Sequence, residues 1–136
     1  MLVKKDKRTG ASLGTGRRKT AVVRVRILDG DGQVTVNNRP VEDYFPTETD
    51  RHYIYQPLDA AGLKGKVNVH IRASGGGVTG QAQACLMGVA RAIISYNQEL
   101  YPQMRDGKFL TRDSRMKERK HYGLRGARRG TQFSKR

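Results

Sequence analysis

A glycine-rich segment, residues 75–80 (GGGVTG), is the part of this chain that most suggests chemistry. It matches the pattern G-x-G-x-x-G and lies between an expected strand and an expected helix, as a dinucleotide-binding turn does. The acidic residue of such a site stands at the end of a second strand. Glu99 has about the right separation, but it lies near the end of the expected helix, and no apolar strand follows it. The sequence therefore disfavours a dinucleotide site.

The same loop remains a candidate for binding phosphate. Glycines allow close approach of the backbone, and free N–H groups at a helix N-terminus suit any phosphate, including one in an RNA backbone. An ordinary structural turn is the alternative.

A second group of residues, Gly14 to Thr20 (GTGRRKT), superficially resembles a nucleoside triphosphate loop. Arg18 occupies the place of the glycine that precedes the Lys-Thr pair in such loops, and no strand is expected before it. We therefore reject a triphosphate site. Arg17, Arg18 and Lys19 at the entry to a strand instead favour contact with a polyanion, with a solvated charged surface as the alternative.

Metal binding and catalysis find little support among the remaining residues. Asp29-Gly30-Asp31 begins like a calcium loop, but Val34 and Pro40 stand where the glycine and the bidentate acid are needed, so a hairpin turn is expected. Cys85 is the single cysteine and lies on an apolar stripe, which predicts a core residue. The spacing typical of metal ligands is also absent among the histidines, which are His52, His70 and His121. We therefore predict no metal, no cofactor and no catalytic group.

The strongest charge lies in residues 114–136, which hold nine cations against one carboxylate, Glu118, and so carry more than half of the net charge of +15. This segment has too few apolar residues to fold alone, and nucleic acid is the commonest partner for such charge. The side chains of Tyr122 and Phe133 are able to stack on exposed bases. A localisation signal or a membrane-attracted segment is the alternative, the latter weakened by the lack of an amphipathic helix or lipidation motif.

Length and composition restrict the classes of protein to which this chain can belong. The chain has 136 residues and a pI near 10.5, which predicts one small domain with basic extensions. Its beginning has no hydrophobic run and predicts no signal peptide, and the least polar stretch, residues 78–90, is too short to cross a bilayer. We therefore expect a soluble, intracellular protein that binds neither a membrane nor a small-molecule substrate.

The periodicity of apolar residues predicts the strands and helices that position these residues. Alternation predicts strands over residues 21–28 and 67–73, and a shorter one over residues 33–36 that pairs antiparallel with the first. A helix capped by Thr79 is expected to run to Leu100. Residues 41–46 predict a helical turn, residues 47–62 a short helix broken before Pro57, and residues 103–113 another short helix. The predicted organisation is a flexible extension (1–13), a globular RNA-binding domain (14–113) and an extended basic tail (114–136).

Five segments in one order carry a resemblance to a known family: GTGRRKTAVVRV, VEDYFP, QPL, GGGVTGQAQA and the terminal DSRMKERKHYGLRGARRGTQFSKR. Together they resemble the ribosomal protein nine family of the small subunit, in its bacterial type. The resemblance implies an α+β fold, a compact β-α-β domain similar to the second domain of ribosomal protein five. It also implies a left-handed crossover, where the general rule alone would predict a right-handed one.

The resemblance further implies a structural, non-enzymatic constituent of the small-subunit head. The implied partners are small-subunit ribosomal RNA, the peptidyl-site tRNA and neighbouring head proteins, in a cytoplasmic or organellar ribosome. The tip that contacts the tRNA would be Ser134, Lys135 and Arg136. The residues facing RNA would be Arg17, Arg18, Lys19, Gly75, Gly76, Gly77, Thr79, Gly80 and Gln81, and along the tail Arg112, Arg115, Lys117, Arg119, Lys120, Tyr122, Arg125, Arg128, Arg129 and Phe133.

Two other functions remain open at this stage. One is a free RNA-binding factor that joins no particle. The other is a small nucleotide-dependent enzyme acting on RNA through the 75–80 loop, although it lacks an acid pair to hold Mg²⁺.

Overall fold

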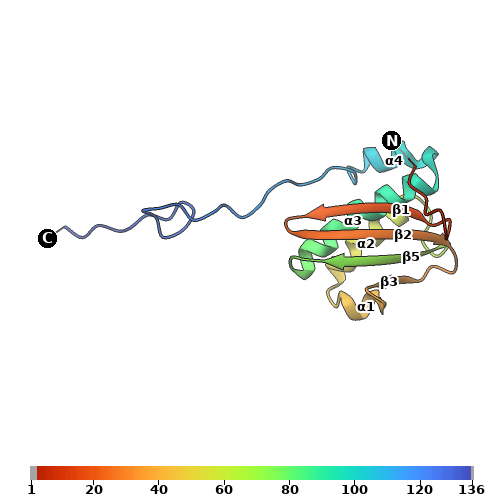
Figure 1. The fold of residues 1–136 in the computed structure, drawn as a ribbon, viewed down its shortest axis with the longest axis horizontal. Coiled ribbons are helices and arrows are strands. Elements are labelled where there is room, and N and C mark those ends of the chain that lie inside the picture. The colour runs from red at the N-terminus through yellow and green to blue at the C-terminus, as the bar shows by residue number, and fades with distance from the viewer. Residues whose placement is uncertain (1–2, 136) are drawn as a thin grey trace.

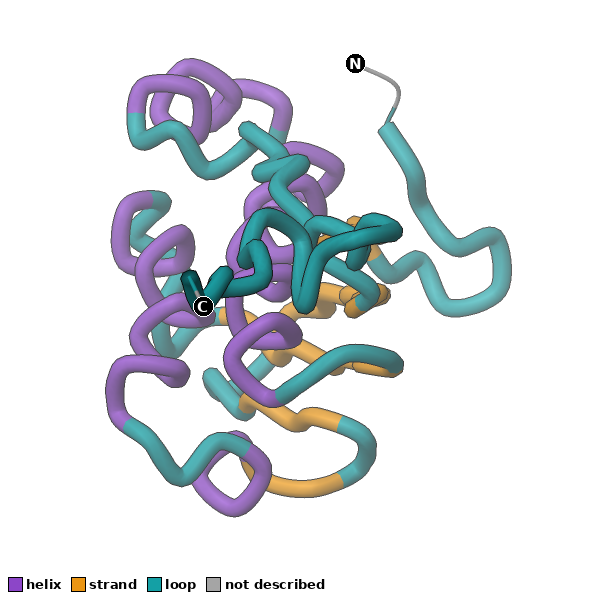
Figure 2. The backbone as a smooth tube through the Cα atoms, turned by 90° about the vertical axis from the view of Figure 1, so that its left-hand side faces the viewer, coloured by secondary structure: helices purple, strands orange, loops and turns teal. Residues whose placement is uncertain are grey.

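The computed structural model describes residues 3–135, and in this part of the chain a five-stranded sheet is covered on one face by helices (Figures 1 and 2). The strand order is β1-β2-β5-β3-β4. The elements are β1 (Ser12–Arg18), β2 (Ala21–Asp29), β3 (Val34–Val36), β4 (Arg39–Pro40), α1 (Val41–Tyr44), α2 (Glu48–Ala60), β5 (Val67–Ser74), α3 (Val78–Tyr96), a 3-10 turn (Gln98–Leu100) and α4 (Tyr101–Asp106). The expected mixture of helix and sheet is confirmed.

The core lies between the sheet and the helices α2 and α3. Alternate residues of β2 and β5 are buried, as the period-two pattern predicts, and their neighbours are exposed on the opposite face. Helix α3 packs into the core with an apolar stripe that includes Ala82, Cys85, Val89 and Ile93. Cys85 is fully buried, and burial raises the pKa of its thiol to about 12. The prediction of a core cysteine is confirmed.

The expected antiparallel pair of β2 and β3 is wrong, because β5 lies between them. β2 pairs antiparallel with β5, and β3 pairs parallel with the other edge of β5. The side chain of Asn68 on β5 holds the connecting loop, since its Oδ1 accepts hydrogen bonds of 3.0 Å from the N–H groups of Asp31 and Gln33. The 29–32 segment is thus a loop passing over the end of β5 rather than a hairpin turn.

Strand β1 was not expected from the sequence. Its inward positions include Gly14 and Gly16, which have no side chains to give an apolar alternation. The structure shows the reason for these glycines: α3 packs directly on the strand backbone. A Cβ atom on Gly16 would lie 2.7 Å from the amide nitrogen of Gly88 and closer still to the carbonyl oxygen of Ala84.

Three expected helix boundaries are also wrong. Helix α2 continues through Pro57 to Ala60, because burial of Ile54 and Leu58 in the core outweighs the one backbone hydrogen bond that a proline removes. The cap position of α3 is occupied by Gly77 rather than Thr79, and no side chain caps it. The same helix ends at Tyr96, not Leu100.

The two ends of the described chain differ. Near the start, Lys5 bridges Ser12, and Leu13 donates a hydrogen bond of 2.8 Å to the carbonyl of Lys4. Lys4 and Lys5 therefore lie against β1, residues 7–9 form an exposed turn, and β1 begins inside the segment expected to be a flexible extension. After Leu110, residues 111–135 form neither helix nor strand and run away from the sheet (Figure 1).

Candidate nucleic-acid interface

The structure brings together the two motifs that the sequence separates by more than fifty residues. The turn between β1 and β2 and the turn between β5 and α3 together line one cavity of about 290 Å³. The lining residues are Arg18, Lys19, Thr20, Gly76, Gly77, Val78, Thr79 and Gly80. A cationic side chain and the start of a helix thus meet at one site, which we call the loop site.

The glycines of the loop site are needed for its shape. Gly75 and Gly76 have φ angles of 72° and 62°, in the left-handed region that favours glycine. A Cβ atom on Gly75 would lie 2.6 Å from the carbonyl oxygen of Thr20, so the two turns touch through their backbones. The first backbone hydrogen bond of α3 runs from the N–H of Gln81 to the carbonyl of Gly77. The N–H groups of the preceding helical residues are therefore directed toward the open side of the loop, as at an anion site.

Gln81 positions this loop from within. Its side chain is only 8% exposed, and its Nε2 donates to the carbonyl of Gly75 at 2.9 Å. Its Oε1 accepts a hydrogen bond of 2.6 Å from the hydroxyl of Tyr44. Sequence reasoning placed Gln81 among residues that face RNA, whereas the structure gives its side chain an internal partner on each side.

Arg18 is likewise engaged within the protein, where it holds the beginning of the tail. Its guanidinium donates to Gln83 Oε1 and to the carbonyl of Arg115, both at 2.9 Å, and pairs with the carboxylate of Asp113 at 3.1 Å. The Arg18 side chain is only 12% exposed. We call this set of contacts the tail clamp. Alternation in β1 explains it, because Arg18 follows Gly14 and Gly16 on the side facing α3, whereas Arg17 points to the other side and is exposed.

Asp113 completes the tail clamp. Hydrogen bonds from the side chain and the backbone of Arg115, with the nearby charge of Arg18, hold the pKa of this carboxyl well below its usual range. It is therefore ionised at neutral pH and links two arginines at the point where the tail leaves the domain. The sequence contains no local signal for this arrangement, since the residues come from segments about a hundred positions apart.

Beyond the tail clamp the predicted RNA-binding side chains are exposed. Tyr122 and Phe133 are 93% and 92% exposed, whereas phenylalanine is most often buried and tyrosine is intermediate in burial. Glu118 accepts hydrogen bonds from His121 and from Arg128, each at 3.2 Å. The predicted tail residues that the structure places on the surface are Arg112, Arg115, Lys117, Arg119, Lys120, Tyr122, Arg125, Arg128, Arg129, Phe133, Ser134 and Lys135. Arg136 lies outside the described residues.

Among the exposed arginines that the predicted site leaves out, three lie on the neighbouring strands β2 and β5: Arg24, Arg26 and Arg72. The alternation of their strands already placed them on outward faces, but only the pairing of β2 with β5 joins them into one surface.

Among residues 3–135, no group of three or more His, Cys, Asp or Glu side chains is arranged to hold a metal ion. A search of the same residues found no helix with the length and apolar character needed to span a bilayer.

Comparison with known proteins agrees with the resemblance seen in the motifs. A family model described as ribosomal protein S9/S16 matches residues 16–136. The chain is also 58% identical, over 134 residues, to the small ribosomal subunit protein uS9 of Rhodopirellula baltica, with 98% of each chain covered. The match therefore includes both the folded domain and the basic tail, and the chain belongs to the ribosomal protein S9/S16 family.

Proposed function

We propose that this chain binds small-subunit ribosomal RNA through the loop site and the tail, and that the tail tip reaches the peptidyl-site tRNA. As a member of its family, it is a structural protein of the small ribosomal subunit and acts in translation within the ribosome. The proposal includes a place in the subunit head beside other head proteins. It also includes the left-handed crossover and the likeness to the second domain of ribosomal protein five.

The single observation that carries the proposal is a tail whose cations face solvent while its base is held to the domain. Fixing the tail at Asp113 and Arg115 lowers the entropy that would be lost on binding, because the first residues are already directed. Beyond them, two exposed aromatic residues, Tyr122 and Phe133, stand among the cations of a segment that buries almost nothing of itself. Arginine and lysine neutralise phosphates, and aromatic rings stack on unpaired bases.

The loop site supports a second point of contact on the domain. Lys19 and the N–H groups at the start of α3 surround the same cavity, so a phosphate there would meet a charge and backbone donors together. The site lies at the end of the sheet where β1 and β5 end and where β2 and α3 begin. One contact on the folded domain and another on the extended tail would anchor the protein and let the tip extend beyond the anchor.

Salt dependence of RNA binding tests the phosphate contacts. If about six cations neutralise phosphates, the logarithm of the affinity falls with the logarithm of the salt concentration at a slope of roughly −4 to −5. The measurement is filter binding of the full chain to small-subunit ribosomal RNA over a salt series. A nearly flat curve would contradict the proposal.

Truncation tests the role of the tip. Removing residues 134–136 leaves the domain, the tail clamp and most tail cations in place, so incorporation into reconstituted small subunits is expected to be unchanged. Binding of tRNA to the peptidyl site of those subunits is expected to weaken. The matched control is the double substitution Lys117→Gln and Arg119→Gln, which also removes two tail cations but leaves the tip. Equal tRNA affinity for the truncated and the full-length protein would refute the role of the tip.

Recovery of the protein in particles separates this function from that of a free RNA-binding factor. A structural component sediments with small subunits after a high-salt wash, whereas a free factor is released.

A further inference from the structure

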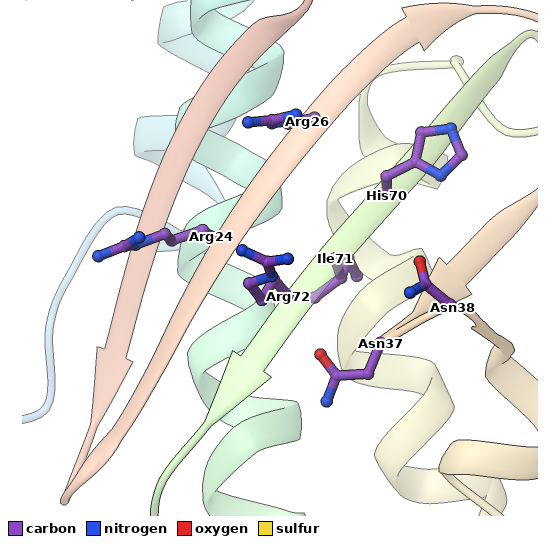
Figure 3. Close-up of a pocket in the computed structure, with 7 residues that line it drawn as sticks. All are labelled: Arg24, Arg26, Asn37, Asn38, His70, Ile71 and Arg72. Atoms are coloured by element: carbon purple, nitrogen blue, oxygen red, sulfur yellow. The ribbon is translucent and has the colours of Figure 1, made fainter.

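The face of the sheet that is turned away from α2 and α3 forms a separate cationic surface. Figure 1 views the sheet from this side, with the helices behind it. Four exposed side chains lie there on the two central strands: Arg24 and Arg26 on β2, and His70 and Arg72 on β5 (Figure 3). We call these four residues the arginine face.

Strand register places two arginines, Arg24 and Arg72, directly opposite one another on this surface. Arg24 pairs with Arg72, and Arg26 pairs with His70, across the antiparallel β2–β5 ladder. Side chains in such pairs stand about 5 Å apart at Cβ, and like charges there destabilise a sheet. The protein without a partner thus carries an electrostatic cost that a bound anion would relieve.

The neighbouring polar groups are held in place. The hydroxyl of Thr35 and Nδ1 of His70 are 2.8 Å apart, which orients the imidazole ring and leaves its Nε2 toward solvent. Asn37 and Asn38 both have positive φ angles, 50° and 64°, and form the tight turn between β3 and β4. The Asn37 side chain bonds to both the N–H and the carbonyl of Ala73, each at 3.0 Å, so this turn is fastened to β5.

A polar cavity of about 230 Å³ lies between these groups (Figure 3). Its lining contains no carboxylate; it consists of Arg24, Arg26, Asn37, Asn38, His70, Ile71 and Arg72. The carboxylate of Asp6 lies near enough for the charge of Arg26 to help lower its pKa, although the main cause is a hydrogen bond from the N–H of Arg8. The oxygens of Asp6 accept hydrogen bonds from the N–H of Arg8 and the hydroxyl of Thr9, so Asp6 offsets the positive charge of the face only in part.

We propose that the arginine face is an additional RNA-binding surface that takes consecutive phosphodiester groups of one RNA strand. This inference rests on the proposed function, since it names a further surface for the same partner. The planar fork of arginine matches phosphate oxygens with two hydrogen bonds. Arg24 and Arg26 are two residues apart on one strand, which separates them by roughly 6.6–6.8 Å, a spacing comparable with that between successive phosphates. The exposed side chain of Asn38 at the rim offers a neutral donor to the ribose or phosphate oxygens.

The test replaces the opposed pair in the full chain, as the double variant Arg24→Gln and Arg72→Gln. The matched control, Lys66→Gln and Arg105→Gln, removes two exposed cations that lie outside the arginine face. Both are measured by filter binding to small-subunit ribosomal RNA across a salt series. The face variant is expected to bind at least about tenfold more weakly, because it loses two arginines that would donate charge-assisted hydrogen bonds to phosphates. Its salt slope is expected to be about 1.4–1.8 smaller in magnitude than that of the wild-type chain, and the control is expected to change little.

Each possible result of these binding measurements either supports or overturns the proposed RNA-binding surface. Equal losses in the two double variants would overturn the proposal, because they would reflect net charge rather than this surface. Unchanged RNA binding by the face variant, together with loss of a neighbouring protein from reconstituted subunits, would assign the face to an acidic protein surface instead and overturn the RNA assignment. Binding by the wild-type chain that does not respond to salt would overturn the proposed function as well, whereas failure of the face variant alone to weaken binding overturns only this surface.

Folding of the variant is checked in the same samples. Removing opposed like charges is expected to leave the urea midpoint unchanged or to raise it. If the double variant were unfolded, the single variant Arg72→Gln provides the measurement, with a decrease in slope of roughly 0.7–0.9 expected and no decrease refuting the surface.

Discussion

Replacing Gly16 of β1 with alanine tests how closely the first strand and α3 are packed. The added Cβ atom would lie 2.7 Å from the amide nitrogen of Gly88 and closer still to the carbonyl oxygen of Ala84. Both obstacles are backbone atoms, so no side chain can rotate to make room. Real Cβ atoms essentially never approach within 3.0 Å of such atoms, and the strand and helix must therefore separate.

The size of the effect follows from that separation. A gap of about 0.5–1 Å removes roughly a quarter to a half of the dispersion energy between the facing atoms. Overpacking a core costs about 1–3 kcal/mol, and more where the backbone must move. We therefore expect Gly16→Ala to lower the free energy of unfolding by about 3 kcal/mol, a large part of the roughly 5–15 kcal/mol typical of a domain.

The expected direction of the change in stability makes Gly16→Ala a strict test of this packing. At an unobstructed strand position, alanine would stabilise the protein by about 0.4–1 kcal/mol, because it restricts the unfolded chain more than glycine does. The measurement is urea unfolding of the full chain, followed by far-UV circular dichroism at fixed salt concentration.

The matched control is Gly80→Ala in α3, where the new Cβ would lie 3.9 Å from the carbonyl oxygen of Arg18, an ordinary contact. Alanine favours helix by up to about 1 kcal/mol over glycine, so this variant is expected to be as stable as the wild-type chain or more stable. A Gly16→Ala protein that unfolds at the same or a higher urea concentration than wild type would refute the packing described for β1 and α3.

Three further predictions concern the tail clamp, the core thiol and the β3–β4 turn. Arg18→Gln removes the ion pair and two hydrogen bonds at the base of the tail, so trypsin is expected to cleave within residues 111–115 several-fold faster than in wild type; unchanged cleavage would show that Arg18 does not hold the tail. Because burial raises the pKa of the Cys85 thiol from the roughly 8.5 of an unfolded chain to about 12, its contribution to stability is complete below pH ~8.5 and is lost as the pH rises toward 12. A thiol reagent at pH ~8 is accordingly expected to react with the protein only after urea is added, and rapid reaction of the folded protein would contradict the burial. Asn37→Ala is expected to cost about 1–3 kcal/mol in urea unfolding, since both bonds to Ala73 are lost; a smaller loss would mean that the turn is held by other contacts.

Comparison of prediction and structure shows which elements a sequence encodes locally. The strands β2 and β5 were predicted close to their observed bounds, and the helix α3 was predicted with its end at Leu100 instead of Tyr96. All three were recognised because each carries enough apolar side chains to display its period. Strand β1 was missed, because Gly14 and Gly16 contribute to packing by having no side chain at all. The pairing of β2 with β3 was predicted wrongly, because nearness in sequence does not decide which strands are neighbours.

For the candidate site as well, the sequence indicated which residues to consider, and only the structure showed their contacts. The loop at residues 75–80, the cations at 17–19 and the basic tail were all recognised from residue type and spacing. What each of these residues does depends on contacts between distant segments. The structure directs Arg18 to Asp113 and the carbonyl of Arg115, turns Gln81 toward Tyr44, and brings Lys19 to the start of α3.

By itself the sequence determined the chemical character of this protein: a net charge of +15, a tail unable to form a core, and five ordered segments typical of one family. Charge and apolar content are sums over residues, so no fold is needed to know them. Only the tertiary structure decided which cations remain free for a partner. Arg18 is used to hold the tail, whereas Arg24 and Arg72 are set opposite each other on an open surface. The physical reason is that a side chain's partners are chosen by strand pairing and helix packing, which join residues far apart in the chain.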